Sequence, residues 1–118
     1  MTFLRNIEQY NNKIAIITNT NLKISYKNLY TKSQSITKDL TPRSLVFLLS
    51  GNNIETIFYY VGLINSKNVI TLLDKDIKNN YLKKLINLYK PNYLILPINF
   101  PDINGYFFYS KFKNYKII

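Results

Sequence analysis

The segment SLVFLLSGNNIETIFYYVGLINSKNVITLLDKDIKNNYLKKLINLYKPNYLIL, residues 44–96, decides the fold. Three short apolar runs in it alternate with two amphipathic stretches of helix length. The apolar runs are residues 44–49, 69–73 and 93–96, and the amphipathic stretches are residues 53–65 and 76–90. Short strands separated by helix-length segments favour a parallel sheet. The carboxyl ends of its strands then open onto one edge, where α/β proteins commonly bind ligands.

A small hairpin and a further helix are predicted before this segment. Residues 14–17 and 22–24 flank the polar turn 19–21, whose asparagines tolerate left-handed conformations. Ser25 is suited to cap a helix that Pro42 would end. The face of that helix predicted to be buried consists of Tyr26, Leu29, Tyr30, Ser33, Ile36 and Leu40. The predicted fold class is therefore α/β, a small β-hairpin followed by a three-layer βαβαβ parallel sheet with flanking helices.

The two helices between the apolar runs each have a predicted inward face. It consists of Ile54, Ile57, Phe58, Val61 and Ile64 in the first helix, and of Ile77, Tyr81, Leu85 and Leu88 in the second. Asn52 and Glu55 are spaced almost as in a capping box. Asp74 and Asp76 are expected at the start of the second helix, where the macrodipole favours carboxylates. Beyond Pro97, residues 106–109 and 115–118 are predicted to pair as a carboxyl-terminal hairpin.

Length and composition favour one soluble domain that spans residues 1–118. Hydrophobic residues make up 47% of the chain, and no apolar run approaches the roughly 20 residues that a membrane helix needs. Residues 1–6 lack the layout of a secretory signal, so we expect a cytoplasmic protein without a membrane partner. The absence of cysteine and histidine excludes disulfides, thiol nucleophiles, thiolate metal sites and the commonest general base.

The net charge of +10, from 16 Lys and Arg against 6 Asp and Glu, raises the question of nucleic-acid binding. The lysines are scattered along the chain, which favours a solvated surface over a basic patch. Their densest cluster is Lys111, Lys113 and Lys116. The 11 Tyr and 7 Phe residues would be able to stack on bases, but most fall on predicted inward faces, which favours core packing.

Two places at the predicted sheet edge carry polar side chains. Residues 50–53 form a turn before a helix, where an anion could bind at the helix amino terminus, although capping the helix explains the turn more simply. Asp74 and Asp76 are a candidate carboxylate pair, which the start of the next helix also explains. The pattern assigns no catalytic, cofactor-binding or metal-binding residue.

Two motifs indicate a family. The stretch ISYKNL, residues 24–29, resembles a motif that reads roughly Leu-Thr/Ser-Tyr-x-Glu-Leu in the AMP-forming acyl-CoA synthetases and related adenylating ligases, the ANL superfamily. Ser25, Tyr26 and Leu29 match this motif, and Asn28 replaces the glutamate. The resemblance is to the N-terminal portion of these ligases, and it extends over residues 13–96.

The second motif lies in residues 63–74. In the family it reads roughly Leu-Lys-Ala-Gly, followed by an apolar run and Pro-Leu-Asp. Leu63 or Ile64, Leu73 and Asp74 match it here. Lys67 stands where glycine is usual, and Leu72 stands where proline is usual.

The resemblance implies a scaffold at the amino terminus of an acid ligase. Such ligases activate a carboxylic acid with ATP to an acyl-adenylate and transfer it to a thiol, so ATP, magnesium and coenzyme A are implied for a full-length parent. The family's glycine-rich phosphate loop has no counterpart here, because Gly51, Gly62 and Gly105 are too far apart to cradle a phosphate. This chain alone is therefore predicted to bind no cofactor and to be inactive.

The implied partner is the remainder of the ligase or a homo-oligomer, contacted through an apolar face. An alternative is a stand-alone protein-interaction module that uses the same face, and a saturable dimer would favour it over indefinite aggregation. A basic nucleic-acid binder is a further alternative, which would require submicromolar binding with a steep salt dependence.

Overall fold

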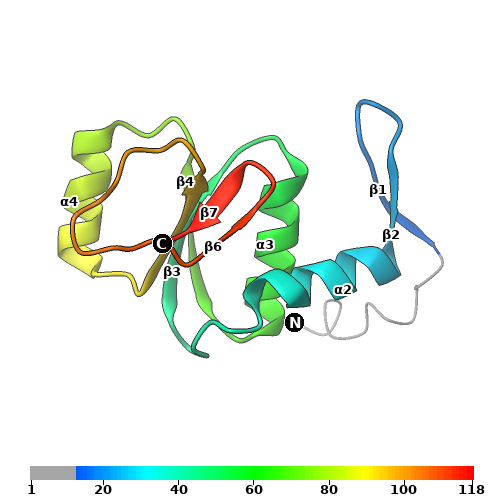
Figure 1. Cartoon of the computed structure of the whole chain (residues 1–118), viewed down its shortest axis with the longest axis horizontal. Helices are drawn as coiled ribbons and strands as arrows, with labels where there is room; N and C mark the ends of the chain where they lie inside the picture. Colours follow the sequence, from blue (N-terminus) through cyan, green and yellow to red (C-terminus); the bar gives the residue numbers. More distant parts are fainter. Residues whose placement is uncertain (1–12) are drawn as a thin grey trace.

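A small hairpin stands beside a larger α/β unit in the computed structural model, which describes residues 13–118 (Figure 1). The hairpin consists of β1 (Ile14–Ile17) and β2 (Lys23–Ser25), which pair antiparallel as predicted. Asn21 in the connecting turn has a φ of 64°, a left-handed conformation that asparagine tolerates. The expectation drawn from residues 1–6 lies outside the described residues.

Helix α2 (Tyr26–Thr37) begins at the predicted cap. The side chain of Ser25 accepts a hydrogen bond of 3.2 Å from the backbone N–H of Asn28. The predicted end at Pro42 is wrong, because the helix stops at Thr37 and the chain then turns, with the N–H of Leu40 donating to the carbonyl of Thr37. This turn carries Leu40 into the core, where only 3% of its surface is exposed, so tertiary packing ends the helix before the proline does.

The main sheet has five strands in the order β4-β3-β5-β7-β6. The strands β3 (Leu45–Ser50), β4 (Val69–Asp74) and β5 (Tyr93–Pro97) are parallel, with β3 between the other two. This arrangement confirms the predicted βαβαβ unit. Strand β3 is buried on both faces, as expected for a parallel strand covered by helices on both sides.

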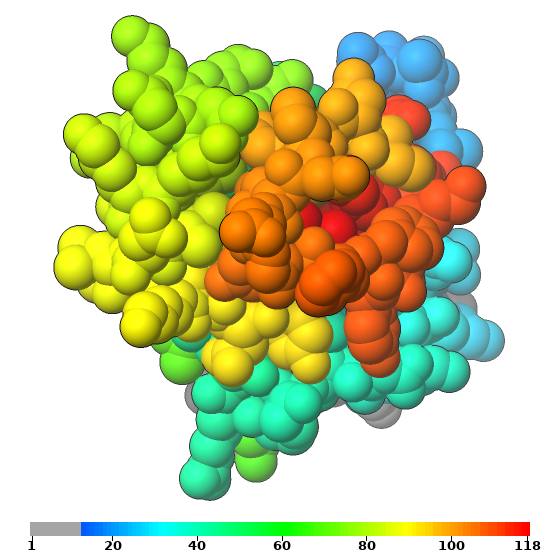
Figure 2. Space-filling model, turned by 60° about the vertical axis from the view of Figure 1, so that its left-hand side comes forward, coloured from blue at the N-terminus to red at the C-terminus, as the bar shows by residue number. Residues whose placement is uncertain are grey.

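The carboxyl-terminal hairpin forms with the predicted second strand, residues 115–118, but its first strand is not the predicted 106–109. Strand β6 (Ser110–Phe112) pairs with β7 (Tyr115–Ile117), and β7 also pairs antiparallel with β5. Residues 106–109, the predicted first strand, form a surface loop in which Phe107 and Phe108 are largely exposed. Figure 2 shows this carboxyl-terminal segment in orange, next to residues of α4 in yellow. Pairing of β7 with β5 sets the register of the hairpin, and a local apolar pattern does not reveal such a contact.

Helices cover both faces of the sheet (Figure 1). Helix α3 (Ile54–Asn65) lies on one face and α2 packs against it, while α4 (Asn79–Tyr89) lies on the opposite face. The α2–α3 packing is close at Gly62, where an added Cβ would lie 2.4 Å from the carbonyl oxygen of Ser33. Within residues 13–118, no helix is both long enough and apolar enough to cross a membrane.

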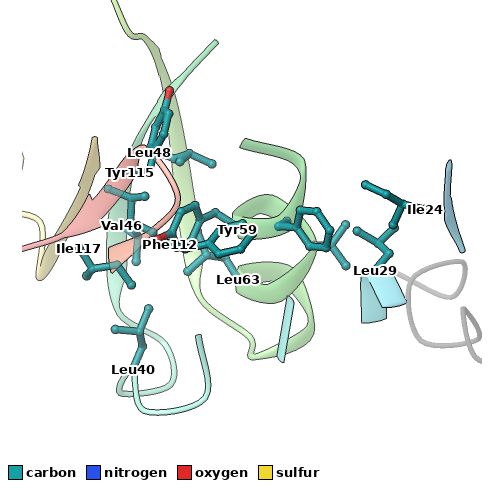
Figure 3. Close-up of a cluster of buried hydrophobic side chains, with 13 residues drawn as sticks. Ile24, Leu29, Leu40, Val46, Leu48, Tyr59, Leu63, Phe112, Tyr115 and Ile117 are labelled. Atoms are coloured by element: carbon teal, nitrogen blue, oxygen red, sulfur yellow. The ribbon is translucent and has the colours of Figure 1, made fainter. Parts of the chain in front are cut away.

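Each face of the sheet has its own apolar cluster. Figure 3 shows the α3 side, where Tyr59, Phe112 and Tyr115 meet the sheet residues Val46 and Leu48. The ring of Phe112 contacts the rings of Phe58 and Tyr59 edge to face, with centroids 5.4 Å and 6.1 Å away. The cluster on the other side contains Phe47, Leu49, Leu82, Ile86, Leu94, Leu96, Ile103 and Ile118. Most predicted core residues of the strands are therefore in the core.

The inward faces of the two helices differ from the prediction. Helix α4 begins at Asn79 and buries Leu82 and Ile86, whereas Tyr81 and Leu88 are 58% and 70% exposed. Leu85 and Ile77 are half-buried. The apolar residues of α4 form one wide arc, and only the part around Leu82 and Ile86 faces the core, so the three-and-four spacing alone indicated the wrong part of that arc. In α3, Ile57 is exposed, while the additional residues Tyr59, Gly62 and Leu63 are buried because α2 covers the helix from outside.

Candidate functional site

The carboxyl ends of β3, β4 and β5 form the sheet edge at which a ligand site was expected. Ser50 at the end of β3 is in register with Asp74 at the end of β4. The hydroxyl of Ser50 donates to the carbonyl of Leu73 at 3.1 Å, and the N–H of Lys75 donates to the carbonyl of Ser50 at 3.0 Å. The hydroxyl and the carbonyl of Ser50 are therefore both hydrogen-bonded to neighbouring backbone groups.

The turn of residues 50–53 is closed by its own hydrogen bonds. The side-chain oxygen of Asn53 accepts from both the N–H and the hydroxyl of Thr56, at 2.9 Å and 2.8 Å. The N–H of Gly51 donates to the hydroxyl oxygen of Thr56 at 3.1 Å. This geometry fits the simpler interpretation of the turn, as a helix cap. The capping residue is Asn53, so the predicted pairing of Asn52 with Glu55 is wrong.

Glu55 instead joins this turn to the carboxyl-terminal hairpin. Its carboxylate accepts a 3.3 Å hydrogen bond from the N–H of Asn114, and only 6% of the residue is exposed. The hydroxyl of Tyr115 donates to the carbonyl of Leu49 at 2.7 Å. The side chain of Asn53 donates to the same hydroxyl at 3.4 Å. The start of β7 and the turn before it thus cover the carboxyl end of β3. These contacts join residues about 60 positions apart, so no local sequence pattern predicts them.

Asp74 and Asp76 form a turn before α4 rather than the start of the helix. The carboxylate of Asp74 accepts a 2.8 Å hydrogen bond from the N–H of Asp76, and the carbonyl of Asp74 accepts one of 3.0 Å from Ile77. The expected interaction of these carboxylates with the α4 macrodipole is wrong, because the helix begins only at Asn79. Local side-chain bonding to the backbone explains Asp74 instead.

Two surface hollows lie near this edge. One, of about 460 Å³, lies between the hairpin and the start of α3, and its lining side chains are all uncharged. They are Ile16, Ile17, Thr18, Asn19, Thr20, Leu22, Asn52, Asn53, Ile54 and Ile57. The other, of about 440 Å³, is lined by Asp74, Asp76, Ile77, Lys78 and Tyr81. Within the described part of the chain, no group of three His, Cys, Asp or Glu residues is placed to hold a metal ion.

The perturbed pKa values belong to tyrosines. Burial and, to a lesser extent, the charge of Glu55 raise the pKa of Tyr59. Burial also raises the pKa of Tyr106, and desolvation followed by nearby Asp39 and Tyr93 raises that of Tyr109. All these shifts move the tyrosines away from neutral pH. They therefore provide no group tuned for acid–base chemistry near pH 7.

The basic cluster of Lys111, Lys113 and Lys116 does not form one surface. Lys116 is 92% buried, and its ammonium group donates to the carbonyl of Phe100 at 3.0 Å. The ammonium group of Lys113 lies 5.8 Å from the centre of the Phe112 ring, and that of Lys32 lies 5.1 Å from it. Phe112 itself is in the core. Lys111 lies opposite Lys116 in the β6–β7 pair, but only Lys111 and Lys113 are exposed, so burial of Lys116 removes one of the three charges from the surface.

No protein-family model matches the chain, and no curated protein matches it. Solved structures do resemble it. The N-terminal subdomain of Klebsiella oxytoca NpsA has a TM-score of 0.72 and 15% identity, over 89% of this chain and 29% of that chain. Apo MatB from Rhodopseudomonas palustris has a TM-score of 0.64 and 18% identity, over 72% of this chain and 18% of that chain. ATP-bound MatB has a TM-score of 0.66, again at 18% identity, with 75% and 19% covered.

At these identities the comparisons establish the fold alone. The chain has the α/β fold found in the N-terminal subdomain of NpsA and within MatB. The predicted resemblance to the N-terminal portion of an AMP-forming ligase is therefore confirmed at the level of the fold. The chain spans less than a third of the length of each of these proteins.

Proposed function

We propose that this chain is the N-terminal scaffold subdomain of an ATP-dependent, AMP-forming acid ligase, and that it is inactive by itself. The observation that carries the proposal is the fold shared with the NpsA subdomain over 89% of the chain. The two ligase-like sequence motifs support it, because one residue of each lies where a helix begins or a strand ends. Ser25 caps α2, and Asp74 ends β4 with its carboxylate bonded to the following turn.

The proposed inactivity is supported by the side chains at the sheet edge. The three glycines lie in separate places, on the turn before α3, inside α3 and in the loop before β6, so no glycine-rich loop can cradle a triphosphate. The larger hollow is lined by uncharged groups, which supply neither a general base nor a charge to stabilise a phosphoryl group. These features support the proposal that the chain by itself binds neither ATP, magnesium nor coenzyme A.

The partner in this proposal is the remainder of the ligase. The solved structures that resemble the chain are more than three times longer than the part it matches, and one MatB structure contains bound ATP. We propose that the groups which bind ATP lie in that remainder and that this chain supports them. A cytoplasmic location is part of the proposal, since a chain without cysteine requires no oxidising compartment.

The test is functional reconstitution. The reading frames next to this gene are searched for a polypeptide with a glycine-rich phosphate loop, and that polypeptide is co-expressed with this chain. We expect a stoichiometric complex that exchanges pyrophosphate into ATP in the presence of a carboxylic acid, whereas neither polypeptide does so alone. A companion that is fully active without this chain would contradict the scaffold role.

A further inference from the structure

The two edges of the main sheet differ in their protection. The edge strand β6 is three residues long and has the exposed Lys111 at its centre, and short length and lysine are features that discourage further pairing. The other edge strand, β4, is six residues long and pairs with β3 in register along its whole length. Its first five residues, VITLL, include no charge, proline or glycine. Strand β4 therefore lacks the usual protection of a sheet edge.

Within residues 13–118, no strand pairs with the outer side of β4, so its backbone is available for pairing there. The N–H of Val69 donates to Ser44 at 2.9 Å, and the N–H of Lys75 donates to Ser50 at 3.0 Å, so odd-numbered residues direct their backbone groups toward β3. The carbonyl of Asp74 already accepts from the N–H of Ile77. Because the direction alternates along a strand, the backbone groups of Ile70 and Leu72 and the N–H of Asp74 point away from the sheet. An added strand would satisfy these groups.

Apolar side chains flank the same edge. Val69 and Leu72 on β4 are 57% and 52% exposed. The exposed residues Tyr81 and Leu88 of α4 are seven positions apart, on the same side of that helix. Tyr81 lines one hollow together with Asp74, the last residue of β4, so this side of α4 adjoins the strand edge. The edge of β4 and the exposed side of α4 that carries Tyr81 and Leu88 together form a surface suited to an extended segment with apolar side chains.

Charge and length indicate what covers this surface. A second copy would bring together two chains that each carry a net charge of +10, which opposes self-association, whereas an acidic polypeptide is attracted. The proteins that share the fold also have long further parts, since this chain spans at most 29% of them. We propose that β4 accepts an extended segment of a net-acidic companion polypeptide as the sixth strand of the main sheet. The companion rests on the proposed function, in which it is the remainder of the ligase.

The probe is a blocked heptapeptide in which valine alternates with glutamate, added to the full chain while amide hydrogen exchange is followed by NMR. Without peptide, the amides of Ile70 and Leu72 should exchange faster than those of Thr71 and Leu73, which donate to β3. With peptide, exchange at Ile70 and Leu72 should slow by about tenfold or more. A peptide with lysine in place of glutamate should give no protection. Unchanged exchange at saturating peptide, equal protection of the β6 edge, or equal protection by the lysine peptide would overturn the proposal.

Two matched variants test the position. Leu72→Glu and Ile17→Glu make the same change of charge at similarly exposed aliphatic residues, 52% and 60% exposed, but only Leu72 is on β4. We expect Leu72→Glu to weaken binding of the acidic peptide about tenfold, and Ile17→Glu to leave it nearly unchanged. Equal effects of the two variants would contradict a site at β4. Protection that grows with the concentration of the chain, without peptide, would identify a second copy as the occupant and overturn the acidic companion.

The outcome is separable from that of the proposed function. Reconstituted pyrophosphate exchange without protection at β4 would remove the docking edge and leave the ligase proposal intact. Protection at β4 by the acidic peptide, without reconstitution by any neighbouring polypeptide, would support the docking edge and remove the ligase as its partner.

Discussion

The two faces of the main sheet are covered in different ways. On one face, α3 is enclosed between the sheet and α2, and it buries residues around most of its circumference. On the other face, α4 has the sheet as its main neighbour, buries Leu82 and Ile86, and leaves Tyr81 and Leu88 exposed. A helix that packs against a single layer can therefore have an apolar arc wider than its buried part, and the rest of that arc stays exposed.

The largest expected effect tests which side of α4 faces the core. Leu82→Ala should lower the free energy of unfolding by about 2–5 kcal/mol, because Leu82 is fully buried and its removal leaves a cavity. The control Leu88→Ala, on the exposed side of the same helix, should change it by less than about 0.5 kcal/mol. Urea unfolding measures both. A larger loss for Leu88→Ala would restore the face that the sequence pattern predicted.

The close packing of the other face is tested at Gly62. Gly62→Ala should cost about 1–3 kcal/mol even though alanine favours helices, because the new Cβ would meet the Ser33 carbonyl at 2.4 Å and push α2 from α3. Gly51→Ala is the matched control. There the close atoms, 2.7 Å and 2.8 Å away, belong to the side chains of Lys75 and Asn53 and not to backbone, so we expect a smaller loss. Equal losses for the two variants, measured by urea unfolding, would argue against the close α2–α3 contact.

A smaller effect on stability is expected to distinguish Tyr59 from Tyr115, two buried tyrosines on the α3 side of the sheet whose ring centroids lie 6.3 Å apart. Tyr115→Phe should cost about 1–2 kcal/mol, because the carbonyl of Leu49 loses its 2.7 Å donor. Tyr59→Phe should be neutral or stabilising, since the buried hydroxyl of Tyr59 has no hydrogen-bond partner among the described residues. Thermal unfolding of the two variants checks the difference, and the reverse order would contradict it.

Alkaline pH provides a further test of Tyr59. The pKa of Tyr59 is raised in the folded protein, so the unfolded chain loses this proton first. The contribution of Tyr59 to stability is therefore complete below about pH 10 and falls as the pH rises further, by at most about 1.4 kcal/mol per pH unit. Stability measured at about pH 9 and about pH 11 should fall less in Tyr59→Phe than in the natural chain. Identical falls would show that the residue does not titrate differently on unfolding.

The smallest effect concerns the connection between α3 and β4. Lys67 has a φ of 61°, a left-handed conformation that favours glycine. Lys67→Gly should therefore raise the free energy of unfolding by about 0.5–1 kcal/mol. Lys38→Gly is the control, because Lys38 has an ordinary φ of −60° and should gain nothing. A gain of equal size at both positions would point to an effect of charge rather than of backbone conformation.

The parallel unit was predictable because its signals are local. The apolar runs that became β3, β4 and β5 are separated by segments of helix length, and Ser25 precedes its helix with a suitable cap. These features depend on neighbours in sequence, and the fold class followed from them.

The remaining features depend on contacts between distant residues. Two adjacent asparagines were equally suitable to cap α3, and only the fold selects Asn53. The bonds from Asn114 to Glu55 and from Tyr115 to Leu49 link residues 59 and 66 positions apart, so the closure of the candidate site had no local signal. The buried face of α4 was ambiguous because its apolar arc is wider than the part that the sheet covers.

We propose that this fold supports acid activation without containing the groups that perform it. The most direct measurement is the exchange of labelled pyrophosphate into ATP by the pure chain, with magnesium and a panel of carboxylic acids. We expect no exchange above that of a blank without protein. Exchange that depends on one acid and disappears when the chain is unfolded would contradict it.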